Sequence, residues 1–174
     1  MNPLQQDQRM AYYWTQVRRS GEKIRQFDWP SVEVLLNLVY LNDILSARLS
    51  SIAADYGLSR AGINVLNILN RSETKGCKHH EISKLLLVSR ANVTGLINSL
   101  IRKGFVQREY DASDRRVCIA RITSAGEELL ASFAPVYHKE IKRIFSGLSL
   151  SEKKTLNQLL GKVQETIQQT GTSV

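Results

Sequence analysis

The segment from Val88 to Thr123 constrains the fold of this chain more than any other. Apolar residues recur at helical spacing up to Arg102, the Lys103-Gly104 pair is a normal helix stop, and two alternating segments follow on either side of a charged turn. This order predicts a helix over 90–103 and a hairpin with strands over 105–110 and 117–122. Such a helix fits the major groove of DNA, and a basic hairpin tip can reach a neighbouring minor groove.

The rest of the chain is predicted to be helical. Apolar periodicity and cap residues indicate helices over about 4–26, 31–55, 59–70, 81–87, 125–146 and 151–168. Ser124 with Glu127 and Ser149 with Glu152 match the capping-box pattern, and Pro135 predicts a kink. The expected fold class is therefore mostly α with a small β-hairpin wing.

The helix over 90–103 has two distinct faces. One face is apolar, and the other is polar and nearly free of acidic groups, as suits an anionic partner. Asn92 and Asn98 can present a donor and an acceptor to adenine, and Arg90 or Arg102 can contact phosphate or guanine. Gly95, in the middle of the polar face, indicates either close approach to the groove or a tolerated surface glycine. The apolar residues are Val93, Leu96, Ile97, Leu100 and Ile101; the polar face carries Ala91, Gly95, Asn98 and Arg102, flanked by Asn92, Thr94 and Ser99.

The turn between the two predicted strands is too polar for a core hairpin. Its Arg116 can enter a narrow, electronegative minor groove, and Asp114 can orient that arginine by a charge-assisted hydrogen bond. The alternative is a turn held by an ordinary surface salt bridge, which contributes little.

Charge is concentrated in the same part of the chain. Residues 71–121 hold eleven Lys or Arg against five Asp or Glu, which accounts for most of the net charge of +8. We interpret this excess as phosphate-contacting charge, with simple solubility as the alternative. The N-terminus MNPLQQDQRM does not match a signal peptide, and the sequence has no long apolar run, so we expect a cytoplasmic protein without a membrane partner.

The run from Ile82 through the Gly-Phe-Val-x-Arg step and the Asp-Arg-Arg turn to the Thr-x-x-Gly that opens the next helix resembles the MarR family of transcriptional regulators. The resemblance implies a winged helix-turn-helix over 59–123 and a helical dimerisation region over 1–58 and 124–174. It also implies double-stranded DNA and a second copy of the chain as partners. With Arg102 added from the helix face, the predicted DNA-binding residues are Ser89, Arg90, Ala91, Asn92, Thr94, Gly95, Asn98, Arg102, Asp114, Arg115 and Arg116.

The family often binds small aromatic acids, so a small aromatic effector is a further expected partner. Candidate ligand-binding residues are the N-terminal aromatics, although aromatics at helical spacing are more often core; they are Tyr12, Tyr13, Trp14, Trp29 and Tyr40. Cys77, between Lys75 and Lys78, is either a thiol of lowered pKa or an ordinary free thiol. A metal site at Cys77, His79, His80 and Glu81 is disfavoured because adjacent histidines diverge, and no metal or cofactor is expected.

The sequence thus predicts a ligand-responsive repressor that binds a pseudo-palindromic operator as a dimer. Alternatives are a thiol-responsive regulator of the same fold and a non-specific architectural DNA binder. An enzyme is disfavoured because the chain has no nucleotide loop, no convincing Ser/His/Asp arrangement and no paired carboxylates.

Overall fold

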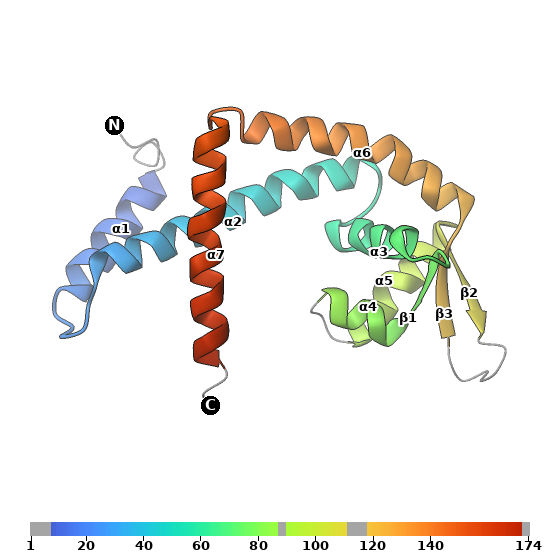
Figure 1. Cartoon of the computed structure of the whole chain (residues 1–174), viewed down its shortest axis with the longest axis horizontal. Helices are drawn as coiled ribbons and strands as arrows, with labels where there is room; N and C mark the ends of the chain where they lie inside the picture. The colour runs from blue at the N-terminus through green and yellow to red at the C-terminus, as the bar shows by residue number, and fades with distance from the viewer. Residues whose placement is uncertain (1–7, 87–89, 111–117, 172–174) are drawn as a thin grey trace. The chain divides into compact units, whose positions relative to one another are not determined.

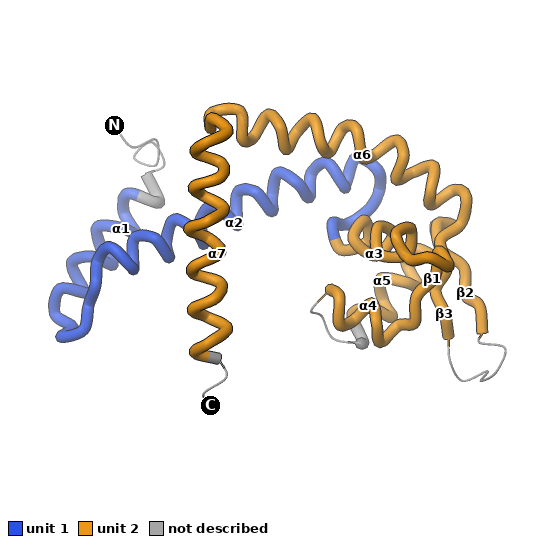
Figure 2. The backbone as a smooth tube through the Cα atoms, in the orientation of Figure 1, with its two compact units in different colours: residues 1–60 blue, residues 61–174 orange. Residues whose placement is uncertain are grey.

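The computed structural model describes residues 8–86, 90–110 and 118–171 and divides the chain into two compact units, 1–60 and 61–174 (Figures 1 and 2). The elements confirm the mostly α fold class with a small antiparallel sheet. They are α1 (Gln8–Gly21), α2 (Trp29–Asp55), α3 (Arg60–Arg71), β1 (Gly76–Lys78), α4 (His79–Leu86), α5 (Arg90–Arg102), β2 (Val106–Tyr110), β3 (Cys118–Ile122), α6 (Ser124–Ile144) and α7 (Leu150–Gly171).

The first unit contains α1 and α2, joined by a short turn. The predicted extension of the first helix to residue 26 is wrong, because α1 ends at Gly21. A Cβ at Gly21 would lie 2.1 Å from the Phe27 ring, so a larger residue here would displace that ring. Ile24, counted as a helical apolar residue, instead lies exposed in the turn.

The second helix begins as the sequence indicates. Asp28 caps α2, its carboxylate accepting a hydrogen bond from the Ser31 amide at 3.0 Å, and Pro30 occupies the first turn, where its missing N–H costs nothing. The hydrogen bond from the Ser31 side chain first, and that from the Ser31 amide second, lower the pKa of Asp28 below its ordinary value. The helix therefore starts two residues before the predicted position.

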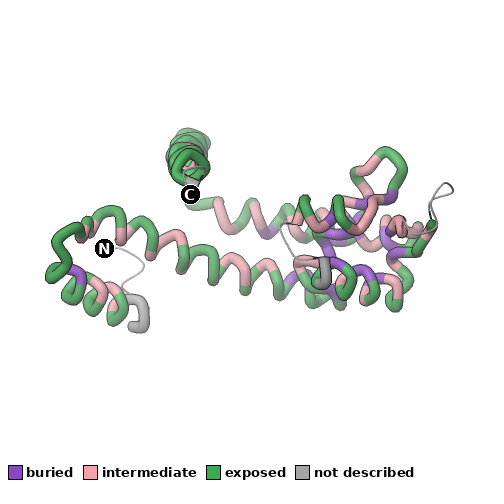
Figure 3. The backbone as a smooth tube through the Cα atoms, turned by 90° about the horizontal axis from the view of Figure 1, so that it is seen from below, coloured by how far each residue is buried: buried purple, intermediate pink, exposed green. Residues whose placement is uncertain are grey.

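The core of the second unit lies between α3, α4, α5 and the sheet, and Figure 3 shows buried backbone concentrated there. Helices α4 and α5 contact each other, α5 contacts β2, and α4 contacts β1 and β3. The most buried side chains come from three helices and are Val65, Leu66, Leu69, Ile82, Val93, Ile97 and Leu100. Burying side chains of this size supplies most of the stabilisation that holds α5 in place.

The sheet has three antiparallel strands in the order β1-β3-β2. In the hairpin, Val106 pairs with Ile122 and Tyr110 pairs with Cys118. Strand β1, which the sequence analysis missed, adds to the outer edge of β3, with Gly76 opposite Arg121 and Lys78 opposite Ile119.

Two long helices complete the second unit. The capping box predicted at Ser124 and Glu127 is wrong, because the cap of α6 is Thr123, whose hydroxyl accepts from the Gly126 amide at 3.2 Å. Glu127 instead forms an ion pair with Lys75 at 2.8 Å. The box at Ser149 and Glu152 is confirmed: the Glu152 carboxylate accepts from the Ser149 amide at 2.7 Å, and Ser149 Oγ accepts from the Glu152 amide at 3.3 Å.

Helix α7 carries an apolar stripe that the described residues of its unit leave exposed. The stripe recurs at helical spacing over Leu156, Leu159, Val163 and Ile167, all exposed. Within residues 8–86, 90–110 and 118–171, no helix combines the length and apolar content needed to cross a membrane.

Candidate nucleic-acid interface

Helix α5 has the two faces that its sequence predicts. Val93, Ile97 and Leu100 are fully or almost fully buried, and Leu96 and Ile101 are half-buried. On the opposite side the predicted polar residues Asn92, Thr94, Gly95, Asn98 and Arg102 are exposed. The burial of one face fixes the helix so that the other faces solvent.

The end of α5 is defined by Gly104, which has a φ of +77° that favours glycine. The Gly104 amide donates to the Ile101 carbonyl at 2.9 Å and the Phe105 amide donates to the Leu100 carbonyl at 3.0 Å. This pair of hydrogen bonds is a Schellman motif, which satisfies the last carbonyls of the helix. It directs the chain from α5 immediately into β2.

The β2–β3 hairpin also has two faces. Val106, Ala120 and Ile122 are buried on the side that packs under α5. Since side chains alternate along a strand, Arg108 lies on the same side of β2 as Val106, closer to the hairpin tip. Gln107 and Glu109 lie on the other side.

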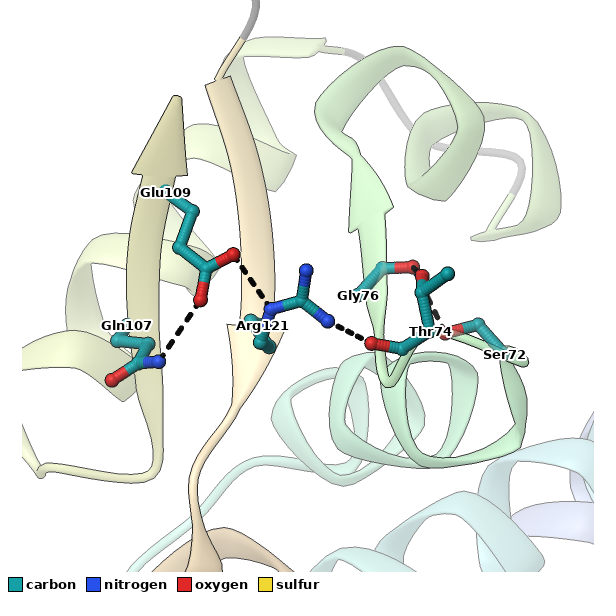
Figure 4. Close-up of polar contacts among 6 residues, drawn as sticks. All are labelled: Ser72, Thr74, Gly76, Gln107, Glu109 and Arg121. Carbon is teal, nitrogen blue, oxygen red and sulfur yellow. Dashed lines mark hydrogen bonds and ion pairs between the residues drawn. The ribbon is translucent and has the colours of Figure 1, made fainter. Parts of the chain in front are cut away.

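A polar ladder crosses the outer face of the sheet (Figure 4). Arg121 on β3 donates to the Glu109 carboxylate at 2.7 Å and to the Thr74 carbonyl in the turn before β1, and Gln107 donates to Glu109 at 3.2 Å. The hydroxyls of Ser72 and Thr74 both donate to the Gly76 carbonyl, at 2.9 and 3.3 Å. The ladder therefore ties all three strands together at the base of the hairpin.

Part of the positive charge is paired within the unit. Arg121 is paired with Glu109, and Lys75 is paired with Glu127. At least two of the eleven basic residues therefore form ion pairs with acidic residues of the same unit. Arg102 and Arg108 are exposed beside the polar face of α5.

Sequence analysis missed Arg108 as a site residue. Its guanidinium donates a hydrogen bond to Asn98 Oδ1 on α5. Burial first, and the charge of Arg108 second, lower the pKa of His79, whose Nε2 is buried without a hydrogen-bond partner in the described part of the chain. The alternation of β2 after buried Val106 was the signal that could have placed Arg108 beside α5.

The remaining predicted contact residues fall into two groups. Arg90 and Ala91 lie in the first turn of α5. Ser89 and the wing residues Asp114, Arg115 and Arg116 lie outside the described residues, so their roles stay predictions.

The aromatic residues proposed as a ligand site all belong to the first unit. Tyr12 and Tyr13 are 63% and 61% exposed and pack edge to face on α1, with ring centroids 6.0 Å apart. Trp29 contacts Phe27 and lies under the guanidinium of Arg18, 5.4 Å from its carbon. The Trp14 indole N–H is buried with no partner among the described residues. Trp14, Trp29 and Tyr40 are half-buried, and a ligand site at these five residues stays a prediction.

Cys77 does not have the low pKa that its lysine neighbours would favour. Burial raises its pKa to about 11, helped by the hydrogen bond from Cys77 Sγ to Glu81 Oε2 at 3.2 Å and by the negative charge of Glu81. The lowered-pKa alternative is therefore wrong. Among the described residues, no three His, Cys, Asp or Glu side chains come together to hold a metal ion.

Cys77 is expected to react slowly with alkylating agents. With a pKa of about 11, roughly a thousandth of the thiol is ionised at pH 8, and only the thiolate is nucleophilic. In a Cys118→Ser background, iodoacetamide should modify Cys77 at least about tenfold more slowly than it modifies an unstructured cysteine peptide. The rate should still rise between pH 9 and 10.

Glu81→Gln should accelerate this reaction severalfold, because it removes the adjacent negative charge while burial remains. The exposed Glu73→Gln is the matched control and should leave the rate unchanged. Rapid modification of Cys77 at pH 7 would contradict the assignment and revive a thiol-responsive regulator.

Comparison with known proteins agrees with this geometry. The family model for the MarR family matches residues 56–117. The HTH-type transcriptional regulator YkoM of Bacillus subtilis is 36% identical over 141 residues, which cover 78% of this chain and 90% of YkoM. The chain belongs to the MarR family.

Two further proteins resemble this MarR-family chain over most of its length. The HTH-type transcriptional repressor YetL of Bacillus subtilis is 26% identical over 149 residues, 86% of this chain and 89% of YetL. The crystal structure of Sco3205 from Streptomyces coelicolor, a MarR family regulator in complex with DNA, matches with a TM-score of 0.64 and 25% identity, covering 78% of this chain and 89% of Sco3205. The family identifies the chain as a transcriptional regulator with a winged helix-turn-helix fold.

Proposed function

We propose that this regulator binds a pseudo-palindromic operator as a homodimer and represses transcription in the cytoplasm until a small molecule releases it. The observation that carries the proposal is the outer face of α5. This face is polar, exposed and free of acidic residues. The buried apolar face of the same helix holds it in position. An anionic groove lined with base edges is the partner that such a face fits.

The charge near this face supports DNA as the partner. Arg102 on α5 and Arg108 on β2 flank the polar residues, and both are exposed. Lys75 and Arg121, in contrast, form ion pairs within the unit. The related regulator Sco3205 was crystallised in complex with DNA, which supports DNA as the partner.

Exposed apolar side chains support the proposal that the protein forms a homodimer. Leu156, Leu159, Val163 and Ile167 form one stripe on α7, and α2 exposes Val34, Leu35, Val39, Leu41 and Ile44. Exposed apolar side chains gathered on one helix mark an interaction surface in a folded protein. A dimer would bury the stripe and place two α5 helices about one DNA turn, roughly 34 Å, apart.

A binding titration tests the proposal. The full chain is titrated against DNA from upstream of its own gene and against a scrambled duplex of equal length at about 150 mM salt. We expect the upstream DNA to bind at least about 1,000-fold more tightly, with two protected half-sites one helical turn apart. Equal affinity for the two duplexes, with a steep salt dependence, would identify a non-specific architectural binder instead. Dissociation of the protein from the upstream DNA on addition of an aromatic acid would support the proposal that a small aromatic effector relieves repression.

Gly95→Ala tests how closely α5 approaches the DNA. A Cβ at Gly95 would meet nothing within 4 Å, so alanine should stabilise the fold by about 1 kcal/mol by raising helix propensity. The same methyl group would project into the groove, and operator affinity should fall. Thermal melting and the binding titration measure the two effects.

The matched control is Gly161→Ala on α7, where an added Cβ also meets nothing within 4 Å. It should stabilise the fold by a similar amount and leave operator affinity unchanged. If Gly95→Ala also leaves affinity unchanged, Gly95 is a tolerated surface glycine.

A further inference from the structure

The contact between Arg108 and Asn98 joins two elements that both face the proposed DNA. Arg108 comes from β2 and Asn98 from the exposed face of α5, and the Arg108 guanidinium donates to Asn98 Oδ1. The residues are ten positions apart, separated by the helix stop at Gly104. The contact is therefore a consequence of the fold rather than of local helical spacing.

The packing beneath the contact fixes the position of Arg108. Val106, two residues earlier on the same side of β2, is only 2% exposed, and β2 contacts α5. Ala120, the cross-strand partner of Arg108, is fully buried. Because the strand is held at both points, Arg108 emerges where the packed part of the hairpin ends and meets α5 at Asn98.

The chemistry of the two side chains determines how the Asn98 amide is oriented. A guanidinium has only donors, so it can bind only the oxygen of an amide group. The NH₂ group of Asn98 must then point away from Arg108. This orientation follows from the partner's identity and does not depend on distinguishing oxygen from nitrogen in the side chain.

The surroundings leave room for a base edge next to this NH₂ group. Asn98 lies in an open depression of about 560 Å³ lined by Gly95, Asn98, Ile101, Arg102 and Arg108. Gly95 contributes no side chain, and the two arginines make the depression positive. An electron-rich hydrogen-bond acceptor is the group that fits beside two guanidiniums and an amide donor.

We propose that Arg108 is a positioning residue that engages the oxygen of Asn98 and directs its NH₂ group outward, so that Asn98 selects a base by donating to an acceptor atom. This inference rests on the proposed operator binding and corrects the expectation that Asn98 pairs with adenine through both its oxygen and its nitrogen. A two-point contact with adenine uses N7 as acceptor and the N6 amino group as donor. Because Arg108 holds the Asn98 oxygen on the side of β2, the NH₂ group is the part of the amide that reaches the base, and it donates to N7 of a purine, O6 of guanine or O4 of thymine.

The first experiment finds the base pair that Asn98 contacts and deletes its groups one by one. Wild type and Asn98→Ala are compared on operators that carry every single base-pair substitution, and the pair at which only wild type discriminates is the Asn98 position. Operators are then made with base analogues there. 7-Deazapurines delete N7, 5-methyl-2-pyrimidinone deletes O4 of thymine, and purine or 2-pyrimidinone deletes the amino group of adenine or cytosine.

Wild type should lose about tenfold in affinity when one acceptor is deleted and less than twofold when the amino group is deleted. An equal loss from the amino-group deletion would overturn the inference, because Asn98 would then be reading with both atoms. If Asn98→Ala alters discrimination at no position, the inference also fails. In both cases specific binding by wild type would leave the proposed function standing, whereas its absence would defeat the function itself.

The second experiment removes Arg108. Arg108→Met keeps an unbranched chain but frees the Asn98 amide to turn, so the preference at the Asn98 position should shift towards adenine and the amino-group deletion should now cost about fivefold or more. Arg102→Met is the matched control, since it removes an equal charge from the same depression. It should weaken binding and leave base preference at the Asn98 position unchanged.

Arg108→Lys provides a second variant that keeps the charge, in case Arg108→Met does not fold; thermal melting reports on both. Lysine retains donors only, so a lysine that reaches Asn98 preserves the wild-type preference and the weak response to amino-group deletion. The inference fails if both variants fold normally and keep the wild-type base preference, and if deleting the amino group still leaves the operator affinity of Arg108→Met almost unchanged. Arg108 would then not position Asn98.

Discussion

Gly126→Ala is expected to destabilise the second unit by about 1–3 kcal/mol, and by more if the neighbouring backbone cannot move. A Cβ at Gly126 would lie 2.4 Å from the Phe105 carbonyl oxygen and 2.8 Å from Ile122 Cγ1. Phe105 directly precedes β2, and Ile122 ends β3. Alanine would therefore force the first turn of α6 away from the hairpin, or the hairpin away from α5.

Chemical denaturation of the two glycine variants provides the comparison. Gly126→Ala should lower the denaturation midpoint and Gly95→Ala should raise it, although the two substitutions are chemically identical and both lie in helices. The opposite signs follow from the crowding around Gly126 and the open space around Gly95. A midpoint for Gly126→Ala equal to that of wild type would show that α6 does not pack on Phe105.

Leu159→Glu is expected to separate the dimer and to reduce operator affinity about 100-fold or more, because a second binding module in one particle adds avidity of that order. Leu159 is 54% exposed within the described chain and lies in the apolar stripe of α7. A carboxylate there leaves the fold of each chain intact but cannot be buried unpaired between two copies. Light scattering should report a mass of 19.7 kDa instead of twice that value.

Gln158→Glu is the matched control, since it adds the same charge one residue away, on the exposed opposite side of α7. It should leave both mass and operator affinity unchanged. A Leu159→Glu protein that remains dimeric with full affinity would show that α7 does not contribute to the interface.

The features that sequence predicted correctly depend on local chemistry. The polar and apolar faces of α5, the stop at Gly104 and the cap at Ser149 each depend on residues within one or two turns of each other. Local patterns of this kind determine capping and helical periodicity with little influence from the rest of the fold. The family resemblance predicted that this segment folds as a winged helix-turn-helix.

The features that sequence missed depend on contacts between distant residues. Strand β1 is three residues long and forms only because β3, more than forty residues later, offers a free edge. The position of the α6 cap one residue early, at Thr123, follows from its hydrogen bond to Gly104. The pKa of Cys77 depends on burial and on Glu81 rather than on the lysines beside it in sequence.

The site residues within one helix were predicted from sequence, and the one that depends on packing between elements was not. Asn92, Thr94, Gly95, Asn98 and Arg102 lie on one exposed face as expected, since a helix fixes their spacing. Arg108 was missed because its relevance comes from the approach of β2 to α5. Arg121 was included in the basic excess of residues 71–121, and its partners are Glu109 on β2 and Thr74 in the turn before β1.

The hydroxyl of Thr123 connects the first turn of α6 to the end of α5. The same oxygen donates to the Gly104 carbonyl, just after α5, at 2.7 Å and accepts from the Gly126 amide, in the first turn of α6, at 3.2 Å. Any rotation of α6 must either carry the end of α5 with it or break one of these two bonds. A movement of α6 is therefore transmitted to the end of α5 by the Thr123 hydroxyl, by the hydrogen bond from the Thr123 amide to the Phe105 carbonyl at 3.1 Å, and by the packing of Gly126 on Phe105 and Ile122.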